Sequence, residues 1–215
     1  MLKVFLYFFI VVSAFADDKP LISDAAALIY ENDFSGKDFK SPFKKPAKGD
    51  WTFPGQYMDY KEKPDDNHPG VLKFDKVEGD FIVEMEIRFP KDKRGDKFMA
   101  GLVINAKGHL GRVNISNKGF STQKDKSEEK DFVKWEKTLN LEQWYTFRFE
   151  CIKDTFICGF NGTIVSVSHK EIENSPVKTI CITGSNKAQF RHFKVHKATA
   201  KKDFKSILTK LKKTP

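Results

Sequence analysis

The chain has 215 residues, of which 40% are hydrophobic and 31% are charged, with both signs of charge well represented. This balance excludes bulk disorder, and the length predicts a single globular domain. Phenylalanine accounts for 21 residues, and because aromatic side chains favour strands, we expect a β-rich domain. Three cysteines are too few for a disulfide framework.

A basic residue, a short apolar run and an Ala-x-Ala sequence open the chain: Lys3, residues 4–12 and residues 14–16. These three features predict a cleaved secretory signal. A retained anchor or a buried N-terminal helix is the alternative, but nine apolar residues are too few to span a bilayer core, which needs roughly 20. We therefore expect a signal peptide over 1–16, cleavage near Ala16, and a secreted, periplasmic or cell-envelope protein without a transmembrane segment.

Residues 17–197 read as one domain built from about ten short strands. The clearest strand, 81–89, alternates apolar and charged residues, and 145–151 with 156–167 predict a hairpin that turns at Lys153-Asp154. Within the second segment, Asn161-Gly162 indicates a second turn or a bulge. Residues 36–70 are rich in Pro, Gly, Lys and Asp and predict a long surface excursion. The expected strands are 25–34, 51–53, 71–74, 81–89, 98–105, 110–116, 120–124, 145–151, 156–167, 178–183 and 188–196. This series predicts an all-β fold, a two-sheet antiparallel sandwich or jelly roll.

Residues 198–215 form a basic amphipathic tail. The stretch from Lys197 to the end carries a net charge of +6, which leaves the body nearly neutral. Apolar residues recur at i, i+3, i+4 and i+7 from Phe204 to Leu211, so we expect a short C-terminal helix. Such a helix either packs its apolar stripe on the domain, which we favour, or makes a weak contact with a membrane surface or an acidic partner. A nucleic-acid partner is not expected, since no basic and aromatic patch recurs in the body.

Four stretches resemble the 3-keto-disaccharide hydrolase domain family, which has a concanavalin A-like (lectin/glucanase) jelly roll. These stretches are 28–38 (LIYENDFSGKD), 79–89 (GDFIVEMEIRF), 142–162 and 190–195 (FRHFKV). The resemblance implies the jelly-roll fold and a hydrolytic or lyase activity on sugars, in a divergent exported member. The family's pocket segment is not matched, because residues 98–114 stand in its place. No catalytic role is therefore carried over residue by residue.

Glu84, Glu86 and Arg88 share the charged face of one predicted strand, and they are the weak catalytic candidates. Two carboxylates about 5–10 Å apart carry out glycoside hydrolysis, and neighbours on one strand face satisfy that spacing. A guanidinium beside Glu86 would, however, keep it ionised, the opposite of what a general acid needs. The alternative is a solvated face with cross-strand ion pairs, for instance to Arg112 or Arg148.

Five residues are candidates for binding a sugar: Trp51, His68, His109, Arg112 and Trp135. Indole rings stack on sugar rings, although core packing is the default reading for each tryptophan. His68, and His109 with Arg112, are expected to contact a sugar or to cap loops. His192 and His196 would lie about 13 Å apart on a strand, so we predict no metal site, and no cofactor is expected.

We expect the three cysteines, Cys151, Cys158 and Cys181, to be buried free thiols. The first two lie diagonally across the predicted hairpin, at a borderline distance for a disulfide.

Three functions remain open. The first is an exported carbohydrate-binding domain without chemistry of its own. The second is a glycan-processing enzyme, as the resemblance implies. The third is an envelope-associated structural protein held by its basic tail.

Overall fold

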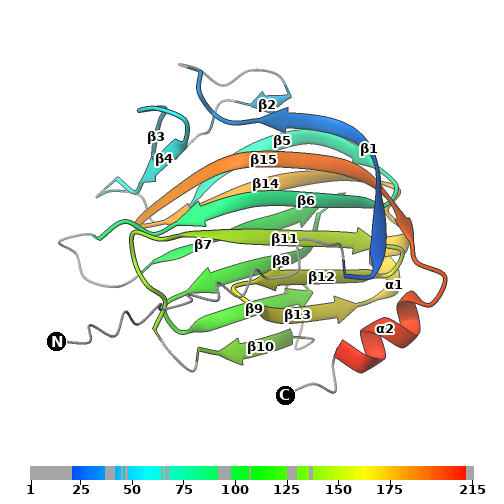
Figure 1. The fold of residues 1–215 in the computed structure, drawn as a ribbon. Helices are drawn as coiled ribbons and strands as arrows, with labels where there is room; N and C mark the ends of the chain where they lie inside the picture. The colour runs from blue at the N-terminus through cyan, green and yellow to red at the C-terminus, as the bar shows by residue number, and fades with distance from the viewer. Residues whose placement is uncertain are drawn as a thin grey trace, which may run out of the picture.

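The computed structural model of this protein describes residues 21–36, 42–44, 46, 48–63, 65, 68–91, 98–106, 108–124, 130–135 and 138–211. The expected signal peptide lies outside these residues, so its cleavage stays a prediction. Within the described part, two antiparallel sheets pack against each other with a hydrophobic core between them (Figure 1). The predicted all-β, two-sheet sandwich is confirmed.

The eight-stranded sheet consists of β1 (Ser23–Asn32), β3 (Asp50–Thr52), β4 (Met58–Lys61), β6 (Phe81–Arg88), β11 (Trp144–Ile152), β12 (Thr155–Phe160), β13 (Thr163–Ser168) and β15 (Lys187–Ala200). Its order is β13-β12-β11-β6-β15-β4-β3, and β1 also pairs with β15. The seven-stranded sheet consists of β2 (Phe43–Lys44), β5 (Gly70–Glu78), β7 (Met99–Asn105), β8 (His109–Ser116), β9 (Gly119–Lys124), β10 (Lys130–Lys134) and β14 (Val177–Ser185). Its order is β10-β9-β8-β7-β14-β5-β2.

The alternation of β6 explains how the two sheets form the core. Phe81, Val83, Met85 and Ile87 are each at most 1% exposed and face the opposite sheet, while Glu84 is only partly buried on the outer side. Most of the fully buried large side chains are aromatic rings, namely Tyr60, Phe34, Phe81, Phe89, Phe120, Phe147, Phe149, Phe156, Phe160, Phe190 and Phe193. The abundance of phenylalanine in the sequence is therefore accounted for by core packing.

The predicted hairpin forms in the expected register, with Cys151 opposite Phe156 in β11 and β12. Lys153 takes up the left-handed conformation that the tight turn requires, with φ of 49°. Asn161 and Gly162 both have positive φ and make a second two-residue turn, which is the typical Asn-Gly hairpin connection. Of the two alternatives for Asn161-Gly162, the turn is therefore confirmed, and it divides the segment 156–167 into two antiparallel strands, β12 and β13.

The longest strand, β15, is paired along both edges. On one edge it pairs with β6; on the other, its first part pairs with β4 and its second part with β1. The register with β6 shifts between Arg191 and Lys194, and His192 within this bulge has φ of 52°. The long central strand therefore joins segments from the beginning, middle and end of the chain into one sheet.

The C-terminal helix α2 (Phe204–Leu211) packs on the outer side of the eight-stranded sheet and leaves both of its lysines, Lys205 and Lys210, exposed. Its Phe204 and Leu208 are buried against Ile22, Ile152 and Ile157, which form a second, smaller core. The docked reading of the amphipathic tail is thus confirmed, and these apolar side chains are not available to a membrane surface.

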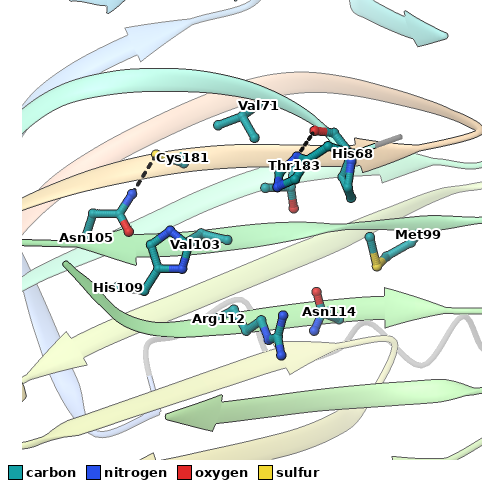
Figure 2. Close-up of a pocket in the computed structure, with 11 residues that line it drawn as sticks. His68, Val71, Met99, Val103, Asn105, His109, Arg112, Asn114, Cys181 and Thr183 are labelled. Atoms are coloured by element: carbon teal, nitrogen blue, oxygen red, sulfur yellow. Dashed lines mark hydrogen bonds between the residues drawn. The ribbon is translucent and has the colours of Figure 1, made fainter. Parts of the chain in front are cut away.

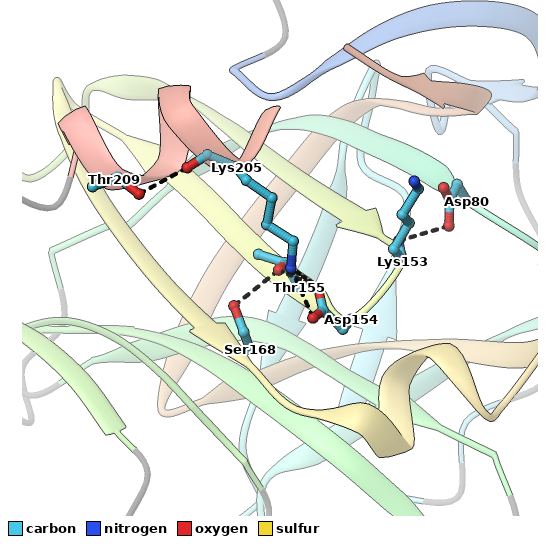
Figure 3. Close-up of polar contacts among 7 residues, drawn as sticks. All are labelled: Asp80, Lys153, Asp154, Thr155, Ser168, Lys205 and Thr209. Carbon is cyan, nitrogen blue, oxygen red and sulfur yellow. Dashed lines mark hydrogen bonds and ion pairs between the residues drawn. The ribbon is translucent and has the colours of Figure 1, made fainter. Parts of the chain in front are cut away.

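An ion pair reinforces the docking of α2. Lys205 Nζ donates to both carboxylate oxygens of Asp154 at 2.8 Å, and Asp154 also accepts a hydrogen bond from Thr155 Oγ1 at 2.9 Å (Figure 3).

A one-turn helix, α1 (Lys170–Glu173), precedes β14. No helix in the described part of the chain has the length and apolar character needed to cross a membrane. All three cysteines are buried and unpaired, as predicted.

Candidate functional site

A pocket of about 250 Å³ opens on the outer face of the seven-stranded sheet (Figure 2). Its side chains come from four neighbouring strands, β5, β14, β7 and β8, and from the segment that leads into β5. The residues that line it are His68, Pro69, Val71, Met99, Val103, Asn105, His109, Arg112, Asn114, Cys181 and Thr183. Three of the five predicted sugar-binding residues, His68, His109 and Arg112, are therefore brought together in one cavity.

A β-bulge explains how His109 and Arg112 come to share this face. Residues three apart on a regular strand point to opposite sides of a sheet. The register between β7 and β8 shifts by one residue here, because Ile104 lies opposite Gly111 whereas Asn105 lies opposite His109. The extra residue in β8 reverses the alternation, so both side chains line the pocket.

Gly101 allows the two strands under the pocket to approach closely. It lies on the outward side of β7 between Met99 and Val103. A Cβ atom at this position would lie only 1.9 Å from the carbonyl oxygen of Val113 on β8. A larger residue would have to push these strands apart, so glycine is required beneath the pocket.

Amide and thiol groups form the polar floor at one end of the pocket. Asn105 Nδ2 donates to Cys181 Sγ at 3.3 Å, and the buried Oδ1 of Asn105 has no hydrogen-bond partner within the described residues (Figure 2). Burial raises the pKa of the Cys181 thiol, while Lys73 and the hydrogen bond from Asn105 act in the opposite direction. The thiol is therefore protonated at neutral pH, and the amide oxygen of Asn105 is a buried acceptor without a donor among the described residues.

The three catalytic candidates lie on the outer face of the other sheet, where each one contacts a side chain of a neighbouring strand. Glu84 Oε1 accepts hydrogen bonds from Arg148 Nε at 2.9 Å and from Nη2 at 2.8 Å, and Glu86 accepts one from Arg191 Nε. Arg88 Nε donates to Gln189 Oε1 at 2.6 Å, and its guanidinium lies over the ring of Trp144.

This face therefore carries the cross-strand ion pairs that were the alternative to a catalytic site. Arg148 supplies one of them, as anticipated, whereas Arg112 lies on the opposite sheet. A cavity of about 470 Å³ lies over Glu84 and Glu86. Both carboxylates in it are held by guanidinium groups, which leaves neither one placed as a free general acid.

The two tryptophans proposed as stacking platforms pack against the core and line neither of these cavities. Trp51 Nε1 donates to the carbonyl oxygen of Lys48 at 2.8 Å, and its ring lies 4.7 Å from that of Tyr60. Trp135 Nε1 donates to the carbonyl oxygen of Ser116 at 2.6 Å, and its ring stacks on Phe120. Core packing, the default reading of these rings, accounts for both positions.

Sequence reasoning missed the polar pocket residues Asn105, Asn114 and Thr183. Each lies on an outward position of a strand that is apolar on its inner side, and this alternation is a signal that could have found them. Among the described residues, no three His, Cys, Asp or Glu side chains are grouped so that they could hold a metal ion.

No protein-family model matches the chain, and no curated protein matches it. Solved structures do. The chain resembles the CBM2 module of the evolved Dit protein of Lactobacillus casei BL23 phage J-1 (TM-score 0.62, 7% identity, 81% of this chain and 96% of that one). It also resembles an endo-β-1,3-glucanase from Pyrococcus furiosus (TM-score 0.61, 11% identity, 81% of this chain and 95% of that one). A third similar structure is the carbohydrate-binding module CBM66 from Bacillus subtilis (TM-score 0.53, 12% identity, 74% of this chain and 99% of that one).

The fold is a concanavalin A-like jelly roll. At these identities the likeness shows the fold alone. It supports the jelly roll that the sequence resemblance implied, and it does not confirm the 3-keto-disaccharide hydrolase family itself. Carbohydrate-binding modules and glucanases both occur among the similar structures, so the fold alone does not decide between binding and hydrolysis.

Proposed function

We propose that this protein is an exported carbohydrate-binding domain whose sugar site is the pocket on the seven-stranded sheet. The observation that carries the proposal is the composition of this pocket. Guanidinium, imidazole and amide groups of Arg112, His109 and Asn114 lie beside the apolar side chains of Val103 and Met99. Polar groups of this kind hydrogen-bond sugar hydroxyls, while apolar side chains cover the C–H face of a ring.

Binding is supported over hydrolysis by where the carboxylates lie. Glycoside hydrolysis by two carboxyl groups needs a free acid and a second carboxylate facing the same bond. Among the described residues that line the pocket, there is no Asp or Glu. Glu84 and Glu86 lie on the other sheet and are paired with Arg148 and Arg191. The keto-disaccharide hydrolase alternative would require a catalytic group outside this arrangement.

A glycan array probed with wild-type protein and three variants tests the proposal. Asn114→Ala removes a hydrogen-bonding group from the pocket, and we expect binding to weaken about two- to tenfold, since one hydrogen bond contributes about 0.5–1.5 kcal/mol. Asn117→Ala is the matched control, because Asn117 is exposed in the turn between β8 and β9, outside the pocket. Its binding should equal that of wild type.

The double variant Glu84→Gln/Glu86→Gln tests the enzyme alternative on the other sheet. We expect its glycan binding to be retained, with its folding verified by circular dichroism. Loss of binding or of sugar turnover in this variant, with Asn114→Ala unaffected, would move the site to the eight-stranded sheet. No binding to any glycan by wild-type protein would overturn the proposed function.

Export is the second part of the proposal and rests on residues 1–16. We expect protein recovered outside the cytoplasm of the expressing cell to begin at Asp17 when its N-terminus is sequenced. An intact Met1 on protein retained in the cytoplasm would contradict export. That result would leave the sugar site unaffected, because the pocket residues lie far from this segment in the sequence.

A further inference from the structure

Basic side chains gather in the pocket. Three of the described side chains that line it contain basic nitrogen, namely His68, His109 and Arg112, and none of the described lining residues is acidic. Outside the lining, Lys73 is close enough to influence the thiol of Cys181 on the pocket floor electrostatically. The pocket is therefore a locally electropositive part of a domain whose body is nearly neutral.

Arg112 differs from the other arginines that the structure describes. Arg148 and Arg191 each hold a glutamate, and Arg88 donates to Gln189 and lies over Trp144. The side chain of Arg112 is exposed and has no hydrogen bond, ion pair or ring contact with any described residue. Its fork of donors is thus free to face a ligand in the pocket.

We propose that the pocket selects a sugar that carries an anionic group, and that the guanidinium of Arg112 binds this group. The inference rests on the proposed sugar-binding function and names its ligand class. A planar guanidinium gives two parallel, charge-assisted hydrogen bonds to a carboxylate, and it binds a sulfate oxygen pair in the same way. Asn114, two residues along the same face of β8, then lies within reach of a neighbouring hydroxyl.

A neutral sugar would leave the charge of Arg112 without a partner, whereas an acidic sugar neutralises it. The difference is specific to the pocket, because the arginine–glutamate pairs on the opposite sheet are already neutralised. Specificity of this kind arises from an electrostatic group that only one class of ligand can satisfy. The expected ligand is consequently a uronic acid or a sulfated sugar rather than a neutral glucan.

Calorimetry with the purified full chain and matched polysaccharide fragments tests this proposal. The carboxylate probes are oligosaccharides of polygalacturonate, polymannuronate and hyaluronan, each beside its carboxyl-reduced form, which keeps the ring and removes the charge. The sulfate probe is a fragment of κ-carrageenan, a sulfated galactan without carboxylates, beside its desulfated and therefore neutral form. We expect at least one acidic probe to bind about tenfold or more tightly than its neutral counterpart, with the preference falling as salt is raised.

Variants of Arg112 locate the effect. Arg112→Gln should abolish the preference for the acidic form, because it removes the charge and the fork, so that the acidic and neutral members of each pair bind this variant equally. Arg112→Lys should keep part of the preference, because it retains the charge but loses the fork. Lys118→Gln is the control for net charge, since Lys118 is exposed in the β8–β9 turn outside the pocket, and it should keep the full preference.

These experiments distinguish a failure of the anionic-sugar inference from a failure of the proposed sugar-binding function. Equal binding of acidic and neutral probes, or an unchanged preference in Arg112→Gln, overturns the inference and leaves the proposed sugar-binding function standing. The same holds if only neutral glycans bind. Absence of binding by every glycan, acidic or neutral, overturns the proposed function and the inference together.

Discussion

Glu150 is predicted to be a stability determinant, because it is a fully buried carboxyl group that holds the start of β1 against β11. It is 0% exposed and accepts three hydrogen bonds. Oε1 accepts from the backbone amide of Leu21, and Oε2 accepts from the amide of Ile22 at 3.0 Å and from Ser23 Oγ at 2.6 Å. Ile22 belongs to the small core beneath α2, so these bonds anchor that core as well.

Glu150→Gln preserves the shape of the side chain but removes its charge and one acceptor. The amide group of glutamine would face a backbone N–H, leaving at least one buried donor unsatisfied at a cost of about 1–3 kcal/mol. The remaining bonds lose their charge-assisted character, which makes them roughly half as strong. We expect the free energy of unfolding to fall by about 3 kcal/mol, which corresponds to a Tm lower by about 6–12 °C for a domain of this size.

Urea unfolding followed by tryptophan fluorescence measures this change. Glu31→Gln is the matched control, because Glu31 pairs with Lys194 at 3.0 Å while its side chain is 49% exposed, and such pairs contribute about 0–1 kcal/mol. Ser23→Ala should lose about 1–2 kcal/mol and should be non-additive with Glu150→Gln, since the two residues share a bond. A change in Glu150→Gln no larger than that of Glu31→Gln would refute the reasoning.

Three further predictions concern the helix and the thiols. Phe204→Ala should destabilise the domain by about 2–4 kcal/mol in urea titrations, because the ring of Phe204 is only 6% exposed. The control is Lys202→Ala, which should change the free energy of unfolding by no more than about 0.5 kcal/mol, because Lys202 is exposed. Equal effects of the two substitutions would contradict the docked helix. Burial opposes ionisation of Asp154, but the hydrogen bonds from Lys205 and Thr155 outweigh it and lower the pKa of this carboxyl. This carboxylate therefore stabilises the folded state at pH values above its pKa in the unfolded chain, about 4, and the stabilisation is lost as pH falls through its lower pKa in the folded state. Lys205→Gln should reduce this loss of stability in urea titrations at decreasing pH. An unchanged pH dependence would contradict the prediction. Burial raises the pKa of Cys151 to about 12, so this thiol should resist Ellman's reagent at neutral pH until urea unfolds the chain; rapid reaction in the native state would show that the site opens.

Elements whose signal is local were predictable from the sequence. The turn at Lys153-Asp154 and the pairing of Cys151 with Phe156 follow from alternation and turn chemistry alone. β4 was missed because its neighbours are rich in Pro, Gly and Lys, which favours a surface loop. Met58 and Tyr60 are nevertheless fully buried, since β4 pairs with β15, more than a hundred residues later in the chain. Pairing over such a separation leaves no local pattern to read.

The candidate site was predictable in residue type but not in arrangement. His109 and Arg112 were named from their chemistry, and the bulge that puts them on one face is invisible to a reading of strict alternation. Trp51 and Trp135 were also named from their chemistry, because indole rings stack on sugar rings. Whether an indole faces a ligand or the core depends on the elements packed over it, which the sequence of one strand does not contain.

The position of β15 at the centre of its sheet has a consequence for synthesis of the protein. Its partners β1, β4 and β6 all leave the ribosome long before it does, and Ser23 finds its pairing residue only at Ala200. Until then, one edge of β6 and the apolar side chains around it lack their native cover. This sheet is therefore completed only after residue 200 has been made, and the nascent chain is exposed to edge-to-edge aggregation during that interval.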